Sequence, residues 1–349
     1  MKPSVLAMPV GIKAALLAAL LFGAATPLAK LFLADNSPWM LAGLFYLGSG
    51  IGLSLYRRIT GAARVVLPAA ERIWFGGAIV AGGIVAPVLL MLGLSHMAAA
   101  GASLLLNAEG VFTAVLAWCV FKENVDRRIV FGMLAIVAGT VILSWPQQAT
   151  LSAEWPALAI LAACLAWAID NNLTRKVSLN DATWVASVKG LIAGSTNLLL
   201  ASAAGAALPA WPVIGSAMLL GLLAYGVSLA LFVVALRHLG TARTGAYFSI
   251  APFLGALLAL ALGEPLTAGL LAAGALMAVG VWLHLTEHHA HAHVHQQMEH
   301  DHEHTHDEHH QHAHEVPIAT GTTHRHPHQH AQLEHRHAHY PDAHHQHRH

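Results

Sequence analysis

Residues 98–121 read AAAGASLLLNAEGVFTAVLAWCVF, an apolar run with one charged side chain, Glu109, near its middle. About 20 apolar residues form a helix long enough to cross the roughly 30 Å hydrocarbon core of a bilayer. A charged side chain deep in such a helix costs about 2.5–3.5 kcal/mol on insertion scales, so such residues are usually functional. The stretch therefore predicts a transmembrane helix that carries chemistry near the bilayer midplane.

Similar apolar runs recur along most of the chain. Of its 349 residues, 56% are hydrophobic and 10% are charged, whereas about a quarter of a soluble domain is charged. We predict an all-α integral membrane protein of ten transmembrane helices. Their predicted ranges are 13–34, 39–56, 73–95, 98–121, 129–146, 155–176, 184–206, 213–236, 243–262 and 267–285.

The basic residues predict the orientation of these helices. If the N-terminus is cytoplasmic, the inner segments contain Arg57, Arg58, Lys122 and Arg128, among others, and the outer loops contain no Lys or Arg. Cytoplasmic loops of membrane proteins are enriched in these residues. An even number of crossings places both termini in the cytoplasm, and we expect a multi-pass protein of the inner (plasma) membrane.

The two halves of the membrane region align with each other. An offset of 145 pairs Trp39 with Trp184, and an offset near 142 pairs His96 with His238. Because five is an odd number, the second five-helix unit must insert upside down, as in many secondary transporters. The predicted repeats cover 1–146 and 147–285.

Three motifs resemble the EamA-type members of the drug/metabolite transporter superfamily. They are Glu109-Gly110-Val111-Phe112, Ala251-Pro252-Phe253 and Gly263-Glu264-Pro265. Gly110 stands where the family usually has proline, and Phe121-Lys122-Glu123-Asn124 stands where it has Gly-Glu-Pro. The resemblance covers roughly 13–285 and implies a ten-helix solute carrier, often an exporter, driven by an ion or solute gradient.

Six polar residues at helix depth are the predicted transport and coupling residues: Glu109, Asp170, Lys189, Asn107, Asn171 and Asn197. Glu109 is either a carboxylate that couples transport to protons or cations, or a neutral, hydrogen-bonded core residue. Asp170 and Lys189 lie at matched depth and are expected to form a structural ion pair, which would also fit at the mouth of a cavity.

The asparagines either line a polar cavity or join helices by hydrogen bonds, and the second role is the commoner one. Pro27, Pro87 and Pro252 fall within the predicted spans. They should bend or break these helices and free backbone carbonyls, either to face a substrate or as a simple packing kink.

The last 64 residues, 286–349, are different in kind, since they contain all but three of the 27 histidines. With few apolar side chains this tail should be disordered when free of metal. Imidazole and carboxylate groups suit Zn²⁺, Ni²⁺, Co²⁺ or Cu²⁺, although a tail that only senses pH is the alternative. The predicted metal ligands are His288, His289, His291, His293, His295, His300, His302, His304, His306, His309, His310, His312 and His314.

These features predict a transporter that exports a small polar solute and has a metal-binding regulatory tail. The alternatives are an exporter of divalent metal cations that uses the tail as a buffer, and a membrane metal sensor without transport. Gly48-Ser49-Gly50-Ile51-Gly52 lies within a span and follows no strand, so it is not a nucleotide loop; no enzyme motif is found.

The expected partners follow from the same features. They are the lipid bilayer and a small-molecule or ion substrate, with a homodimer left open. We expect no required cofactor. The chain has no net charge and no contiguous basic patch, so nucleic acid is not expected to be a partner.

Overall fold

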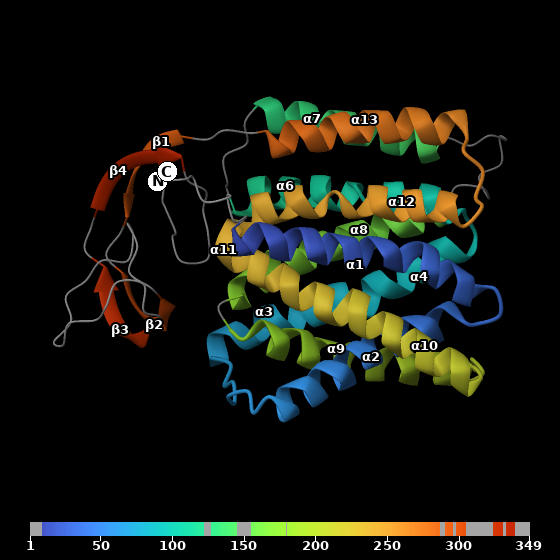
Figure 1. Cartoon of the computed structure of the whole chain (residues 1–349), viewed down its shortest axis with the longest axis horizontal. Coiled ribbons are helices and arrows are strands. Elements are labelled where there is room, and N and C mark those ends of the chain that lie inside the picture. The colour runs from blue at the N-terminus through green and yellow to red at the C-terminus, as the bar shows by residue number, and fades with distance from the viewer. Residues whose placement is uncertain are drawn as a thin grey trace, which may run out of the picture. The chain divides into compact units, whose positions relative to one another are not determined.

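The computed structural model describes residues 9–121, 127–144, 155–178, 180–286, 290–295, 298–304, 324–330 and 333–338. The chain divides into two compact units, Met1–Glu287 and His288–His349. The first is helical, and Figure 1 shows its helices running side by side. Its α-helices are α1 (Val10–Leu33), α2 (Pro38–Ile59), α3 (Ala69–Ala78), α4 (Ala86–Ser95), α5 (Ala99–Leu105), α6 (Ala108–Phe121), α7 (Arg127–Ser144), α8 (Trp155–Thr174), α9 (Ala182–Ala203), α10 (Trp211–Gly221), α11 (Ser228–Phe248), α12 (Ala251–Ala261) and α13 (Ala268–Leu285).

In the part of the chain that the structure describes, two pairs of successive α-helices are joined by a wider, π-helical turn. The segment η1 (Ile79–Val85) joins α3 to α4, and η4 (Leu222–Val227) joins α10 to α11. A short 3-10 turn, η3 (Arg175–Val177), follows α8. Such π turns are rare and occur often at functional sites.

Within the residues that the structure describes, seven helical stretches are long and apolar enough to cross a membrane, judged by length and composition. They are Val10–Leu33, Pro38–Ile59, Ala69–Ser95, Ala99–Val120, Trp155–Val177, Ala182–Ala203 and Trp211–Leu239. Shorter apolar helices cover Val130–Ser144, Ala251–Ala261 and Ala268–Leu283. The prediction of a helical, multi-pass membrane region is therefore confirmed, with seven candidate spans where ten crossings were predicted.

One predicted boundary is wrong. The runs 213–236 and 243–262 were expected to be separate helices, but α11 continues through this region to Phe248 and a turn follows at Ser249 and Ile250. No proline interrupts residues 237–248, so nothing in the backbone forces an end there. The turn comes just before Pro252, which occupies the first turn of α12, the helical position that proline tolerates.

Glycines bring α2 and α9 into close contact. A Cβ atom at Gly50 would meet the backbone of Leu191, and one at Gly190 would meet the backbone of Gly50. Small residues allow helix backbones to approach closely within a membrane, where the hydrophobic effect does not drive helices together. These glycines therefore serve helix packing. Elsewhere α7 packs against α13 and α1 packs against α11 and α12, as Figure 1 shows for the first pair.

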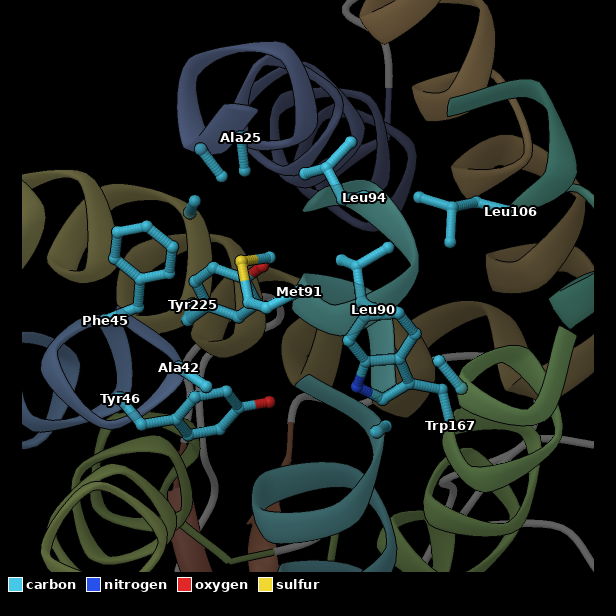
Figure 2. Packing of buried hydrophobic residues seen from close by; sticks show 14 of the residues in the cluster. Ala25, Ala42, Phe45, Tyr46, Leu90, Met91, Leu94, Leu106, Trp167 and Tyr225 are labelled. Carbon is cyan, nitrogen blue, oxygen red and sulfur yellow. The ribbon is translucent and has the colours of Figure 1, made fainter. Parts of the chain in front are cut away.

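Bulky side chains from several helices fill the interior of this unit. Figure 2 shows Phe45 and Tyr46 of α2, Trp167 of α8 and Tyr225 of η4 extending into the space between the helices. The rings of Phe45 and Tyr225 are stacked with centroids 5.8 Å apart, and those of Tyr46 and Tyr225 are 5.1 Å apart. This aromatic layer borders the cavity described below.

The second unit, the histidine-rich tail, contains four strands, β1 (Ala290–His295), β2 (Met298–His304), β3 (His324–His330) and β4 (Leu333–Ala338). β1 pairs antiparallel with β4, and β2 pairs antiparallel with β3. The prediction of a disordered tail is therefore wrong for these segments. Histidine recurs at every second position in them, and such a period of two suits paired strands even without an apolar core.

Candidate functional site: a pocket between the two halves

A pocket lies inside the helical unit and receives side chains from both halves of the chain. It encloses about 440 Å³ of empty space, counting the space at its opening. α1, α2 and α6 contribute to it from the first half, and α8, α9, η4 and α11 from the second. Its lining consists of Phe22, Tyr46, Glu109, Trp167, Asp170, Asn171, Lys189, Ala224, Tyr225, Ser228, Leu229, Phe232 and Phe248.

A buried ion pair forms part of the pocket wall. The Nζ atom of Lys189 on α9 contacts Oδ2 of Asp170 on α8, and the two residues are 1% and 4% exposed. Thr174, one turn along α8, donates a hydrogen bond of 2.9 Å to the other carboxylate oxygen. Removing both charges from water is costly, and the pair offsets this only because each charge faces its partner. The ion pair that the matched depths predicted is thus formed.

Glu109 lies in the first turn of α6, directly after a turn that separates α5 from α6. The positive end of the α6 helix dipole favours a carboxylate at this place. The side chain is half-buried, and Nδ2 of Asn171 donates to its Oε1 at 2.7 Å. Within the described part of the chain, no Lys or Arg forms an ion pair with Glu109. The carboxylate therefore reaches the pocket with an amide partner, and the nearby charges of Lys189 and Asp170 act on it in opposite senses.

The π segment η1 leaves one backbone carbonyl without its helical donor. The N–H of Ala86 bonds Ala81 O in the wider π pattern, so it is not available to Gly82 O. The next residue, Pro87, has no N–H to offer. Gly82 O, deep inside the helix bundle, consequently needs a donor from outside its own helix.

Side chains on neighbouring helices supply donors to η1. Tyr46 Oη donates to Gly82 O at 2.6 Å and Trp167 Nε1 donates to it at 3.0 Å. Asn197 Nδ2 on α9 donates to the next carbonyl, Gly83 O, at 3.1 Å. Pro87 was predicted to free carbonyls, either to face a substrate or as a simple packing kink. Here the freed carbonyl instead fixes two rings of the pocket wall.

The second π segment, η4, is supported in a related way. The N–H of Ser228 bonds Leu223 O, again five residues back. Ser49 Oγ on α2 donates to Tyr225 O at 3.2 Å. The ring of Tyr225 lines the pocket, so both π segments lie beside the cavity.

Phe22 joins the aromatic side chains into one wall. Its ring centroid lies 5.6 Å from that of Trp167 and 5.8 Å from that of Tyr225, both edge to face, and 5.3 Å from that of Phe248. Phe232 meets Phe248 at 5.0 Å. Aromatic pairs at such distances stabilise each other beyond their buried area, so the wall should be well ordered.

The six predicted transport residues divide into two groups. Glu109, Asp170, Lys189 and Asn171 line the pocket. The other two do not: Asn107 donates to Leu104 O at 3.0 Å and to Met277 Sδ at 3.7 Å, and Asn197 supports η1. These two asparagines join structural elements, the commoner role for such residues.

The aromatic wall was not among the predicted site residues, although the sequence held a signal for it. Trp39 and Trp184 lie near span ends, where indole rings favour the headgroup layer, but Trp167 lies within a span. The offset of 145 also pairs Trp167 with Phe22. An aromatic residue at helix depth in both halves is a pattern that could have indicated the wall.

Glu264, in the Gly-Glu-Pro motif, lies outside the pocket and links the two halves. Its two carboxylate oxygens accept hydrogen bonds of 2.7 Å from the N–H groups of Ala99 and Ala100, at the start of α5. Free N–H groups at a helix start favour a carboxylate partner. The motif thus has a structural task, capping a helix of the first half from the second.

The chain was compared with known proteins. Residues 9–145 match the EamA-like transporter family, so the resemblance to EamA-type transporters is confirmed over this region. An uncharacterized transporter of Methanothermobacter thermautotrophicus is 27% identical over 208 residues. This match covers 57% of the present chain and 60% of the relative, less than two thirds of its length.

A protein of known crystal structure has the same fold. The structures superpose with a TM-score of 0.63 at 19% sequence identity, covering 78% of this chain and 95% of the other. At that identity the likeness concerns the fold alone. The matched family is one of transporters, which supports the prediction that the chain is not an enzyme.

Proposed function

We propose that this chain is a secondary-active membrane transporter of the EamA type that moves a small polar solute outward across the inner membrane. The observation that carries the proposal is the pocket, because both halves of the chain line it and charged and amide groups lie in its wall. In transporters built from inverted repeats, substrate sites lie between the repeats near the bilayer midplane. The match of residues 9–145 to a transporter family supports the same function.

The proposal includes ten crossings arranged as two inverted repeats with both termini in the cytoplasm. The offset of 142 carries η1 onto 221–227, and η4 occupies Leu222–Val227. It also carries Asn107, in the turn before α6, onto Ser249, in the turn before α12. Two rare features therefore recur at equivalent places, which supports a common five-helix unit.

The contact between α2 and α9 suits a mechanism in which the halves move against each other. These helices are the second of each proposed repeat and touch through glycines. Alternating access is largely a rocking of one repeat against the other around a fixed site. Close backbone contact at glycines gives a surface with few bulky side chains, on which such a movement can occur.

Transport by the full-length chain in proteoliposomes tests the proposal. Vesicles loaded with labelled amino acids, amines or sugars, or with Ni²⁺, Co²⁺ or Zn²⁺, would be assayed for protein-dependent release. We expect release of one class of organic solute, and at least about a tenfold loss in the Glu109→Gln variant. Glu71→Gln makes the same chemical change at the start of α3, outside the pocket lining, and should leave release unchanged.

Other outcomes would contradict the proposal. Release of metal ions alone that persists after deletion of 286–349 would favour the divalent-metal exporter. Metal binding with no flux of any solute would favour the sensor. Unchanged release from Glu109→Gln vesicles would remove that carboxylate from the mechanism.

We also propose that the tail binds divalent metal, with regulation of transport as its role. The β2–β3 register places His300 opposite His328, His302 opposite His326 and His304 opposite His324. Residues directly opposite in an antiparallel pair have Cβ atoms about 4.5–5.5 Å apart, and imidazole suits Zn²⁺, Ni²⁺ and Cu²⁺. Of the predicted ligands, His288, His289, His306, His309, His310, His312 and His314 lie outside the described residues.

Titration of the full chain with Ni²⁺ tests this role for the strands. Replacing His300, His302, His326 and His328 by Ala should remove the tightest binding. The control replaces four other tail histidines, His309, His310, His312 and His314. Equal losses in the two variants would show that the strand register has no part in binding.

A further inference from the structure

The pocket carries an unbalanced negative charge. Its ionisable side chains come from five elements: Tyr46 from α2, Glu109 from α6, Asp170 from α8, Lys189 from α9 and Tyr225 from η4. Asp170 and Lys189 neutralise each other in their ion pair. Ionised Glu109 therefore leaves the lining with a net charge of about −1, in surroundings where an uncompensated charge is costly.

Several hydrogen-bond donors of the lining are already engaged with the protein. Asn171 donates to Glu109, and Tyr46 and Trp167 donate to Gly82 O. Ser228 Oγ donates to Ala18 O at 2.8 Å. What the lining offers a ligand is therefore mainly a carboxylate and the faces of aromatic rings.

These two features attract the same kind of ligand. Aromatic faces attract cations through the ring quadrupole, most strongly where water is excluded. Phe22, Trp167, Tyr225 and Phe248 form a continuous wall on the same pocket as Glu109. Opposite charge and π faces thus converge on one cavity.

We propose that the pocket binds a small organic cation, an amine or a quaternary ammonium, with its positive charge beside Glu109 and its carbon groups against the aromatic wall. This inference rests on the transport function proposed above and names the class of its substrate. An anion would meet the unpaired carboxylate. A zwitterion would bring a carboxylate of its own close to Glu109.

A divalent metal ion fits the same lining less well. Zn²⁺ takes about four ligands and Ca²⁺ six to eight oxygens. The second carboxylate of the pocket, Asp170, is held by Lys189 and Thr174. A quaternary ammonium needs no such coordination shell, because its charge is spread over carbon-bound hydrogen atoms, and a protonated amine needs acceptors for its N–H groups only, which Glu109 can supply.

Protons should compete with this ligand. Protonation of Glu109 removes the negative charge that the cation neutralises, while the neighbouring Asp170–Lys189 pair stays internally balanced. Affinity for a quaternary ammonium, which cannot itself titrate, should therefore fall as the pH is lowered through the titration of Glu109. Such competition would let a proton gradient drive the export of the cation.

Calorimetry on the full-length chain in detergent tests the inference without any transport. The probes are choline and its neutral isostere 3,3-dimethylbutan-1-ol, which has the same shape without the charge. We expect choline to bind at least about tenfold more tightly than the alcohol. Glu109→Gln should abolish this preference, whereas Glu109→Asp should retain it.

Phe22→Leu tests the aromatic wall separately. The change removes π surface but keeps an apolar side chain in the wall. We expect about a 3- to 30-fold loss of choline affinity with little change for the alcohol. Melting temperatures of the variants in detergent establish that each is folded, and Phe22→Leu remains informative if Glu109→Gln is not.

Two results would overturn the inference. One is equal affinity for choline and the alcohol, and the other is unchanged choline affinity in folded Glu109→Gln protein. The proposed transport function fails separately: protein-dependent release of a neutral solute from vesicles, with no choline preference in detergent, would keep the transporter and reject the cation.

Discussion

The two π segments, η1 and η4, occupy equivalent places in the halves of the chain but pack against different chemistry. At an offset of 142, Gly82 of η1 corresponds to Ala224 of η4. A Cβ atom at Gly82 would clash with the carboxylate of Asp170, whereas Ala224 has its Cβ and is buried. The two segments share a backbone shape but differ in whether a charge lies against them.

The partner helices show the same difference. The offset of 145 relates Asp170 on α8 to Ala25 on α1, a buried apolar residue. The ion pair beside η1 comes from α8 and α9 of the second half, whereas η4 meets α1 of the first half through the rings of Tyr225 and Phe22. The two halves thus share a backbone arrangement. The side chains that a substrate would meet differ between them.

The largest expected effect comes from breaking the ion pair, which only the η1 side has. Lys189→Met would leave Asp170 charged, buried and without its cation, which should cost roughly 3–5 kcal/mol of unfolding free energy. Unfolding by SDS in mixed micelles measures this. The double variant Asp170→Asn, Lys189→Met removes both charges and should regain most of the loss; a double variant as unstable as the single one would contradict a role in charge balance.

A smaller effect should separate the glycines of the two segments. Gly82→Ala forces its new methyl group against the fixed Asp170 carboxylate, so we expect a loss of about 1–3 kcal/mol in the same unfolding assay. The comparison change Gly226→Ala, in η4, meets Ser49 Oγ at 3.1 Å and Leu222 Cδ1 and Ser49 Cα at 3.3 Å, overlaps that shifts of a few tenths of an ångström relieve. Gly226→Ala should lower the unfolding free energy by less than about 1 kcal/mol. Equal losses for Gly82→Ala and Gly226→Ala would contradict the proposed difference between η1 and η4.

The smallest effects concern two of the side chains that support the π carbonyls, Asn197 and Ser49. Asn197→Ala leaves Gly83 O without its donor, and the residue four positions on, Pro87, cannot replace it. Ser49→Ala removes the side-chain donor to Tyr225 O. Here the residue four positions on is Leu229, which has an N–H that can replace the lost donor. We expect the unfolding free energy to fall by about 1–3 kcal/mol for Asn197→Ala and by about 0.5–1 kcal/mol for Ser49→Ala. The reverse order would show that the proline is not the reason for the asparagine.

Much of this architecture was predictable because lipid imposes a strong rule on sequence. Apolar runs located the helical stretches, and matched depth anticipated the contact of Asp170 with Lys189. Depth also selected Glu109, which the structure places on the pocket. These inferences use only position along a helix, which the sequence contains directly.

What could not be predicted depends on neighbours distant in the chain. A π turn needs outside donors such as Tyr46 and Trp167, which lie 36 and 85 positions from Gly82, and no local pattern marks their approach. A loop was predicted before residue 243 because polar residues follow Leu236. The helix α11 nevertheless continues to Phe248, since no proline interrupts it there. The tail strands were not predicted, because the low apolar content of the tail was taken as a sign of disorder. The alternation of its histidines was not used to predict strands.

The glycine contact between α2 and α9 also concerns how the chain is made. Gly50 and Gly190 are 140 positions apart, so at about 5–20 residues per second a ribosome needs roughly 7–28 s to go from one to the other. Throughout this interval the groove formed by the glycines of α2 contacts lipid or an insertion factor instead of α9. Biogenesis should therefore pass through a stage with an unfilled groove, open to quality control until the second half arrives.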